Sequence, residues 1–310
     1  MRILTVMSVC LAGFTPANAF AEYRVLAVGI DKLVIVKPDG AVEWEMPWKG
    51  GTHDLHVLDN GNIMAIRNAH EVVEVDRKTK AEVWSYNAAK SNGNSGKPVE
   101  VHAIQPLPDG AVMIAESGPG RIIEVDRSGK LLKSTALVVS KPDPHRDTRL
   151  ARKLDNGNYL VSHEGDGVIR EYSGKDGKVV WEFPVPMFGK EPKPGHGPEA
   201  FGNQAFSAIR LKNGNTLIGS GNGHAILEVT PEKKIVWEVH QNDLQGVTLA
   251  WVTTLTVLPN GHLVIGNCHA GPGQPQLVEI ERDSRHVVWT FDQFDLLGND
   301  LTNSVLLGKM

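Results

Sequence analysis

The sequence is poor in the residues that mark several large classes of protein. Its 310 residues include 2 cysteines and 6% aromatic residues, and the formal net charge is -4 without a run of Lys or Arg. The lack of a basic surface argues against nucleic acid as a main partner. The sequence also lacks the G-x-S-x-G, C-x-x-C, H-E-x-x-H and glycine-rich phosphate-loop motifs of familiar sites.

Long apolar runs are also missing, except for one at the N-terminus. Apolar residues 3–14 are followed by two Ala-x-Ala sites, an order typical of a secretory signal peptide, and the run is too short to span a membrane. We therefore predict a signal peptide over residues 1–21 and a periplasmic or secreted mature protein over residues 22–310. The mature chain would keep only Cys268, so it could form no internal disulfide.

A turn motif that occurs five times is the strongest signal that is present. Each copy begins with Leu and ends at Gly61, Gly110, Gly157, Gly214 or Gly261. A repeat of roughly fifty residues is typical of propellers, solenoids and arrays. Short runs rich in Val, Ile and Leu between turn residues indicate strands, and Asn-Gly and Asp-Gly favour hairpins. The repeat unit is therefore predicted to be the four-stranded antiparallel blade of an all-β propeller.

The two ends of the chain complete the count of blades. Residues 23–47 contain only three strand-like runs, whereas residues 302–307 form a lone run that resembles the first strand of a blade. Pairing the two ends would build a last blade from both termini and leave no open edge. We predict a single six-bladed β-propeller domain over residues 22–310.

Two residue types recur at one position in nearly every blade. Tryptophan marks the last strand, with one lysine in its place, at Trp44, Trp84, Lys133, Trp181, Trp237 and Trp289. Glutamate marks the third strand, at Glu74, Glu124, Glu171, Glu228 and Glu279. Because repetition indicates framework, we interpret the tryptophans as packing between blades and the glutamates as an outward, solvated row.

These repeats resemble a known family. Units such as Leu258–Gly261 and Gly177–Glu182 are similar to pyrroloquinoline-quinone-like β-propeller repeats, and most similar to those of bacterial arylsulfate sulfotransferases, which have six blades. The resemblance covers almost all of the mature chain and implies the fold. Because the motif is structural, it does not imply quinone binding, and we expect no pyrroloquinoline quinone cofactor.

Positions that differ between blades are the candidates for a functional site. In a propeller, the start of each first strand and the end of each second strand reach the same face of the ring. Eight residues before the turn glycines lie His53, His102, Arg149, Phe206 and Thr253. Six residues after them lie Arg67, Glu116, His163, Ser220 and Asn267. Near these columns in the sequence are His145, Glu164 and His269. We predict that these residues form a polar cluster near the axis.

The first functional hypothesis is a metal-assisted lyase or hydrolase that acts on a polar, sugar-derived or anionic substrate. A divalent metal, Zn²⁺, Mn²⁺ or Ca²⁺, would bind to His53, His102, His163 and His269. The catalytic candidates are His53, His102, Glu116, Arg67 and Arg149. The candidates for binding the ligand are Glu164, Asn267, His145 and Thr253.

Two other hypotheses stay open. The sulfotransferase resemblance implies sulfuryl transfer through an axial histidine, with His53 and His102 as candidates and Arg149 as the anion clamp. Alternatively, the propeller is not catalytic and binds a small molecule, a carbohydrate or a protein at the axial pocket. In each case we expect a monomer without a membrane span.

Long loops rich in Gly and Pro support the same face as the site. They cover residues 87–98, 141–147 and 184–203. Within the last of them, residues 190–198 could cover the channel as a lid or remain a surface loop. The other histidines are expected to be ordinary surface residues, among them His70, His224, His240, His262 and His286.

Overall fold

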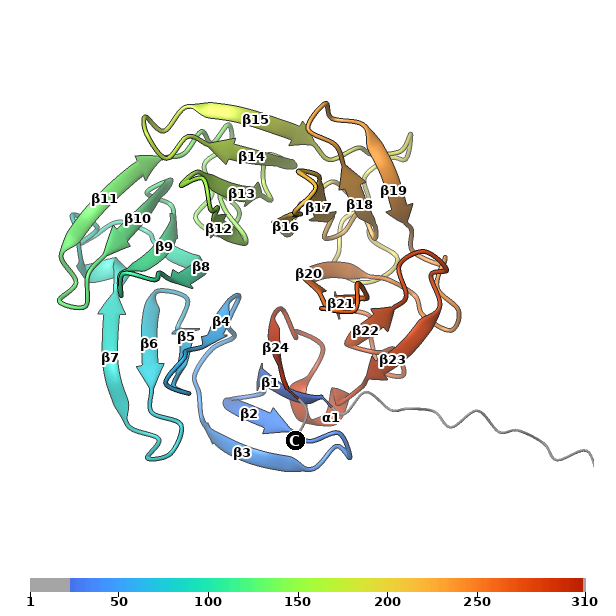
Figure 1. Cartoon of the computed structure of the whole chain (residues 1–310), viewed down its shortest axis with the longest axis horizontal. Helices are drawn as coiled ribbons and strands as arrows, with labels where there is room; N and C mark the ends of the chain where they lie inside the picture. Colours follow the sequence, from blue (N-terminus) through green and yellow to red (C-terminus); the bar gives the residue numbers. More distant parts are fainter. Residues whose placement is uncertain (1–22, 309–310) are drawn as a thin grey trace, which may run out of the picture.

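Six antiparallel sheets of four strands form a ring in the computed structural model, which describes residues 23–308 (Figure 1). The predicted six-bladed propeller is confirmed. The predicted signal peptide lies outside the described residues. Within residues 23–308, no helix is long and apolar enough to cross a membrane.

The first three blades follow one another along the chain. From the axis outward, the strands of the first blade are β4 (Leu55–Val57), β5 (Ile63–Arg67), β6 (Glu71–Val75) and β7 (Glu82–Asn87). Those of the second blade are β8 (Glu100–Pro106), β9 (Val112–Ser117), β10 (Arg121–Val125) and β11 (Leu131–Ala136). Those of the third blade are β12 (Ala151–Lys153), β13 (Tyr159–His163), β14 (Val168–Tyr172) and β15 (Val179–Pro184). A 3₁₀ turn, η1 (Ala88–Lys90), follows the first of these blades.

The other three blades complete the ring. Their strands are β16 (Ser207–Arg210), β17 (Thr216–Gly219), β18 (Ile226–Val229) and β19 (Ile235–Val239); β20 (Trp251–Val257), β21 (Leu263–Cys268), β22 (Leu277–Ile280) and β23 (Val287–Phe291); β24 (Ser304–Leu307), β1 (Arg24–Gly29), β2 (Lys32–Val36) and β3 (Val42–Pro47). The short helix α1 (Phe294–Leu297) precedes β24.

The last blade is closed by both termini, as predicted. Strand β24 pairs antiparallel with β1, with Leu307 opposite Arg24 and Ser304 opposite Ala27. The strand is shorter than the predicted run of residues 302–307 because Thr302 and Asn303 bond to the backbone of residues 52 and 53 instead. The C-terminal segment therefore holds the entrance of β4 as well as closing the ring.

Burial follows the layers of the ring. The second and third strands of each blade are almost wholly buried, because neighbouring blades cover both of their faces. The outer strands alternate instead, as in Glu82–Asn87, where one face meets solvent. The core thus consists of apolar layers between adjacent blades, such as the cluster that contains Met64 of β5 and Ile104 of β8.

The tryptophans pack between blades, as predicted. Their indole nitrogens donate to backbone carbonyl oxygens of the next blade, in the pairs Trp44–Arg77, Trp84–Arg127, Trp181–Pro231 and Trp237–Arg282 at 2.7–3.2 Å. Lys133 takes the tryptophan position in the second blade, and its Nζ donates to the Gly174 carbonyl at 2.5 Å. The lysine therefore makes the same link to the next blade.

The interpretation of the glutamates as a solvated row is wrong. All five are buried, with exposed fractions of 3–7%. Glu171, for example, accepts hydrogen bonds from Asn158 of its own blade's turn and from Arg210 of the next blade, both at 2.6 Å. The third strand is covered on both faces, so a repeated carboxylate there has to be paired inside the protein.

Candidate functional site

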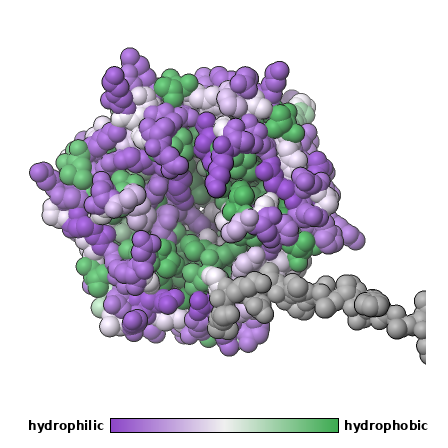
Figure 2. Space-filling view, viewed as in Figure 1, coloured by the Kyte–Doolittle hydropathy of each residue, from purple (hydrophilic) through white to green (hydrophobic). Residues whose placement is uncertain are grey.

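A small pocket lies at one mouth of the central channel, and we call it the axial pocket. Its volume is about 90 Å³, and six of the residues that line it are His53, His145, Arg149, Glu164, His196 and His269. A pocket of this size has room for several water molecules or for a small polar group of a ligand. The space-filling view shows the ring hollowed at its centre (Figure 2).

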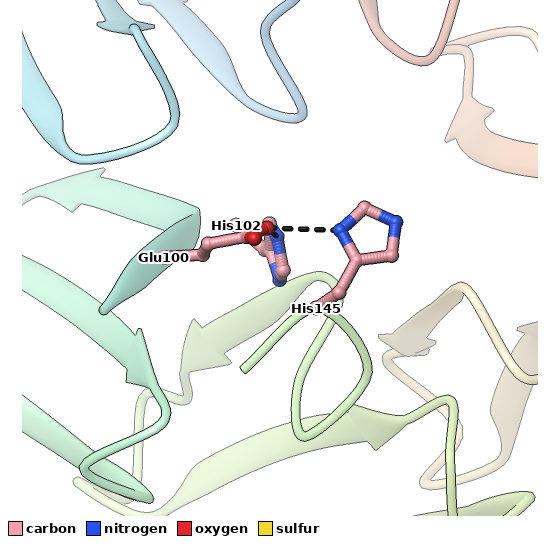
Figure 3. A group of neighbouring side chains, drawn as sticks. All are labelled: Glu100, His102 and His145. Atoms are coloured by element: carbon pink, nitrogen blue, oxygen red, sulfur yellow. Dashed lines mark hydrogen bonds and ion pairs between the residues drawn. The ribbon is translucent and has the colours of Figure 1, made fainter. Parts of the chain in front are cut away.

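Three potential metal ligands converge beside this pocket. The Oε2 atom of Glu100 lies 2.9 Å from His102 Nε2 and 2.9 Å from His145 Nδ1 (Figure 3). One ligand atom from each residue lies within 4.8 Å of the others. Glu100 and His102 are two residues apart on β8, and alternate strand residues share a face. His145 comes from the loop between β11 and β12.

Hydrogen bonding determines which nitrogen of His102 carries its proton. Nδ1 lies 2.7 Å from the carbonyl oxygen of Thr148, and a carbonyl only accepts, so the proton is on Nδ1. Burial and the nearby Arg149 lower the pKa of His102 to about 4, which keeps its ring neutral at pH 7. In that tautomer the Nε2 lone pair would face the Glu100 carboxylate.

The contact between His102 and Glu100 needs either a proton on Nε2 or a bound cation. Hydrogen bonds with His102 and His145 lower the pKa of Glu100 to about 2, so the carboxylate is ionised. A ring protonated only on Nδ1 and without a cation would leave two acceptors 2.9 Å apart, which repel. Two imidazoles and one carboxylate form a set that suits a divalent transition metal.

Arg149 holds the site together rather than standing free as an anion clamp. Its Nε bonds to Glu164, its Nη1 donates to the His145 carbonyl at 2.5 Å, and Nη1 lies 3.2 Å from both ring nitrogens of His102. The Arg149 and Glu164 side chains are 5% and 3% exposed. Of the three guanidinium nitrogens of Arg149, only Nη2 has no hydrogen-bond partner among residues 23–308. This nitrogen remains available to donate to a ligand.

His53 presents an unpaired imidazole to the pocket. Its ring centroid lies 4.6 Å from that of His102 and 6.4 Å from that of His145. Burial, together with the nearby His102 and Arg149, holds the pKa of His53 well below its usual value. No hydrogen bond from the described part of the chain ends on its ring nitrogens, so a neutral nitrogen is available for proton transfer.

The opposite wall of the pocket is aromatic. The rings of His196 and Trp251 are 5.1 Å apart, and His196 lies 5.1 Å from His269. His269 Nδ1 lies 3.0 Å from the Asp300 carboxylate. His269 is not part of the Glu100, His102 and His145 group, so this arrangement does not support the prediction that it shares a metal with His53 and His102.

The expectation that Arg67 and Glu116 reach the axis is wrong. Arg67 bonds outward to Glu71 at 3.0 Å and to Glu82 on the outer strand of its blade. The Oε2 atom of Glu116 accepts from Arg121 Nε at 2.6 Å. At the end of the second strand, these side chains point along the blade toward the outer strands.

Three further candidates serve the framework in this structure. His163 uses both ring nitrogens, with Asp147 O at 2.7 Å and the Tyr172 hydroxyl at 2.8 Å. Asn267 bonds only to backbone groups of nearby loops. Thr253 is buried, and its hydroxyl has no partner among residues 23–308. None of the three lines the axial pocket.

The sequence did not lead us to Glu100. His196 was predicted only as part of residues 190–198, the segment that could cover the channel as a lid. The signal for Glu100 was its position two residues before His102 on one strand, because alternate residues share a face. The structure places His196 in the pocket wall, whereas residues 191–196 are exposed. The expectation that His224 is a surface residue is wrong, since it is 2% exposed.

Acid is expected to destabilise the fold through His163. Burial lowers the pKa of His163 to about 4, whereas the unfolded chain has the ordinary value of about 6.5. Between these values the unfolded state binds more protons, so the free energy of unfolding falls as pH falls, by up to about 3 kcal/mol near pH 4. Urea unfolding from pH 7 to pH 4.5 should show a shallower slope for His163→Gln, and equal slopes would contradict the assignment.

Comparison with known proteins agrees with the type of repeat predicted from the sequence. A family model described as outer membrane protein assembly factor BamB matches residues 31–291. The chain belongs to this PQQ_2 family. No curated protein matches the sequence. The closer likeness to arylsulfate sulfotransferases stays a prediction.

Solved structures share the fold of this PQQ_2 propeller. A protein of unknown function from Bacteroides caccae is 25% identical, with 93% of this chain and 99% of that chain covered and a TM-score of 0.75. A streptogramin B lyase is 13% identical, covering 93% and 94%, with a TM-score of 0.57. A catalytically inactive virginiamycin B lyase from Staphylococcus aureus, solved with quinupristin, is 14% identical, covering 86% and 83%, with a TM-score of 0.54. The two lyases show likeness of fold alone.

Proposed function

We propose that this PQQ_2 propeller is an exported, metal-dependent lyase or hydrolase that acts on a small anionic group in its axial pocket. The observation that carries the proposal is the convergence of Glu100, His102 and His145 on one point, with Glu100 Oε2 2.9 Å from a ring nitrogen of each histidine. The lyase structures with the same fold give no support at the level of residues. The export part of the proposal rests on the predicted signal peptide.

The ligand set favours zinc or manganese over calcium. Catalytic zinc sites use three protein ligands, often two histidines and a glutamate, and keep a further position for water or substrate. Calcium prefers six to eight oxygen ligands, whereas two of the three ligands here are nitrogens. The bond from His102 Nδ1 to the Thr148 carbonyl is the kind of outer contact that orients a metal-binding imidazole.

The residues around the proposed metal site match the needs of such a reaction. A bound metal would polarise a carbonyl or carboxylate oxygen of the substrate. The remaining donor of Arg149 can bind an anionic group beside it. His53, neutral and unpaired, can accept a proton and return it to a leaving group. The Glu164–Arg149 pair keeps the guanidinium in place without closing the pocket.

Metal content tests the proposal. We expect the purified protein, after exposure to Zn²⁺ or Co²⁺, to bind one equivalent, and bound Co²⁺ to show the visible spectrum of histidine ligation. Glu100→Gln and His145→Ala should each weaken binding by about 100-fold or more, because loss of even an outer partner costs 10–100-fold.

Glu43→Gln is the matched control, because it removes the same charge from a surface pair with Arg24. This variant should bind metal as the wild type does. A wild-type protein that binds no Zn²⁺, Mn²⁺ or Co²⁺ would contradict the proposal, and the polar cluster would then be a structural plug.

A further inference from the structure

Residues 186–203, which we call the wall segment, contribute one side chain to the lining of the axial pocket. The wall segment joins β15 to β16 and carries His196. Within it, residues 193 and 201 form an antiparallel bridge. Gln241 donates to the Pro198 carbonyl at 2.6 Å, and Gly202 N donates to the Asn222 carbonyl at 3.1 Å. The segment is thus attached to the fourth blade and to the loop that follows it.

His224 lies at the centre of these attachments. It sits between β17 and β18 and is 2% exposed. Its Nε2 lies 2.5 Å from the carbonyl oxygen of Ala200 in the wall segment. Its Nδ1 bonds to the carbonyl oxygen of Ala250, directly before β20. One imidazole therefore links the wall segment to two blades.

We propose that His224 is a positioning residue of the axial site, which ties the wall segment to the ring through Ala200 and Ala250 and so seats His196 beside Trp251 and His269. Within residues 23–308 no charged side chain bonds to the imidazole of His224, whose aromatic neighbour is Phe201 at 6.0 Å.

The attachment can be measured directly on the full protein. Amide hydrogen exchange of residues 186–203 should be slow in the wild type and faster when the contact to Ala200 is removed, while the inner strands of the other blades stay protected. Exchange in this segment that does not change on removal of that contact would overturn the proposal.

Two substitutions separate the contacts. His224→Gln places an amide near the position of Nε2, so it should keep the bond to Ala200 and hold the wall segment. His224→Asn places an amide near the position of Nδ1, so it should keep the bond to Ala250 and lose the bond to Ala200. We expect exchange in the wall segment of the Asn variant to be about 10-fold faster or more, because the buried Ala200 carbonyl loses its donor. Equal exchange in the two variants would contradict the assignment.

The expected effect on metal binding rests on the proposed function, whereas the attachment of the wall segment by His224 does not. His224→Asn should bind one Co²⁺ as the wild type does but release it faster to EDTA, because the wall over the pocket is loose. His224→Gln should release it at the wild-type rate. Absence of metal in every variant would count against the proposed function, while the exchange data would still decide the role of His224. Equal release rates with bound metal would refute the role of the wall in guarding the site.

Discussion

Ending the chain at Asn303 should destabilise the protein by about 5 kcal/mol, since the lost strand contains three aliphatic residues worth roughly 1.5–3 kcal/mol each when fully buried. The truncation removes β24 and leaves the edge of β1 without a partner. Leu307 is buried, and Val305 and Leu306 pack against two different core clusters. A loss of this size approaches the whole stability of many domains, so much of the protein should be unfolded at 37 °C.

Urea unfolding followed by tryptophan fluorescence would measure this loss. A chain that ends at Leu307 is the matched control, because it keeps the closing strand, and it should unfold like the full chain. Adding a synthetic peptide of residues 302–307 to the truncated chain should restore part of the stability by filling the open edge. If the truncated chain is as stable as the control, the ring does not depend on this closure.

Replacing Asp54 with Ala should cost about 3–5 kcal/mol, because it removes a fully buried carboxylate that pairs with the half-buried Arg152 and accepts further hydrogen bonds from buried groups. Asp54 is fully buried at the start of β4. Arg152 of the third blade binds it with both terminal nitrogens, at 2.7 and 2.9 Å. Its carboxylate also accepts from Ile104 N at 2.9 Å and from Asn303 at 3.0 Å. Burial alone would raise the pKa of Asp54, but Arg152 and His56 hold it below its usual value.

This carboxylate joins four blades at the channel, so its loss should affect the whole ring. Urea unfolding of Asp54→Ala, with the exposed turn residue Asp59→Ala as control, gives the cost. The double variant Asp54→Ala/Arg152→Met should recover part of the stability, because it also removes the unpaired cation. If the double variant is less stable than Asp54→Ala, the pair does not act as a coupled ion pair.

The repeated residues show how far a local pattern reaches. Trp84 was assigned to packing between blades from its recurrence alone, and its indole does bond to the next blade. Glu74 recurs equally well, but recurrence does not tell which way a carboxylate points. The third strand is covered on both faces, and Glu74 therefore meets Asn62 and Arg127 inside the protein. A position in the repeat identifies framework, whereas the partners come from the neighbouring blade.

The candidate site also contains residues that spacing in the sequence placed correctly and residues that it did not. Offsets from the turn glycines brought His53 and His102 to one level, and their rings are 4.6 Å apart. The same offsets failed for Arg67, because the direction of its side chain depends on Glu71 and Glu82. Charged side chains take their final direction from the counter-ions within reach, and these are not visible from spacing.

The sequence by itself determined the number of blades, the strands and the closure by both termini. Turn residues, strand propensity and apolar runs act over a few residues, so one chain is enough to recognise them. Only the tertiary structure decided that Glu100 meets His145, which is 45 residues away, and that the rings of His196 and His269 lie 5.1 Å apart in the pocket. Such contacts depend on how loops fold over a finished ring, and the energies that choose them come from burial and pairing between distant residues.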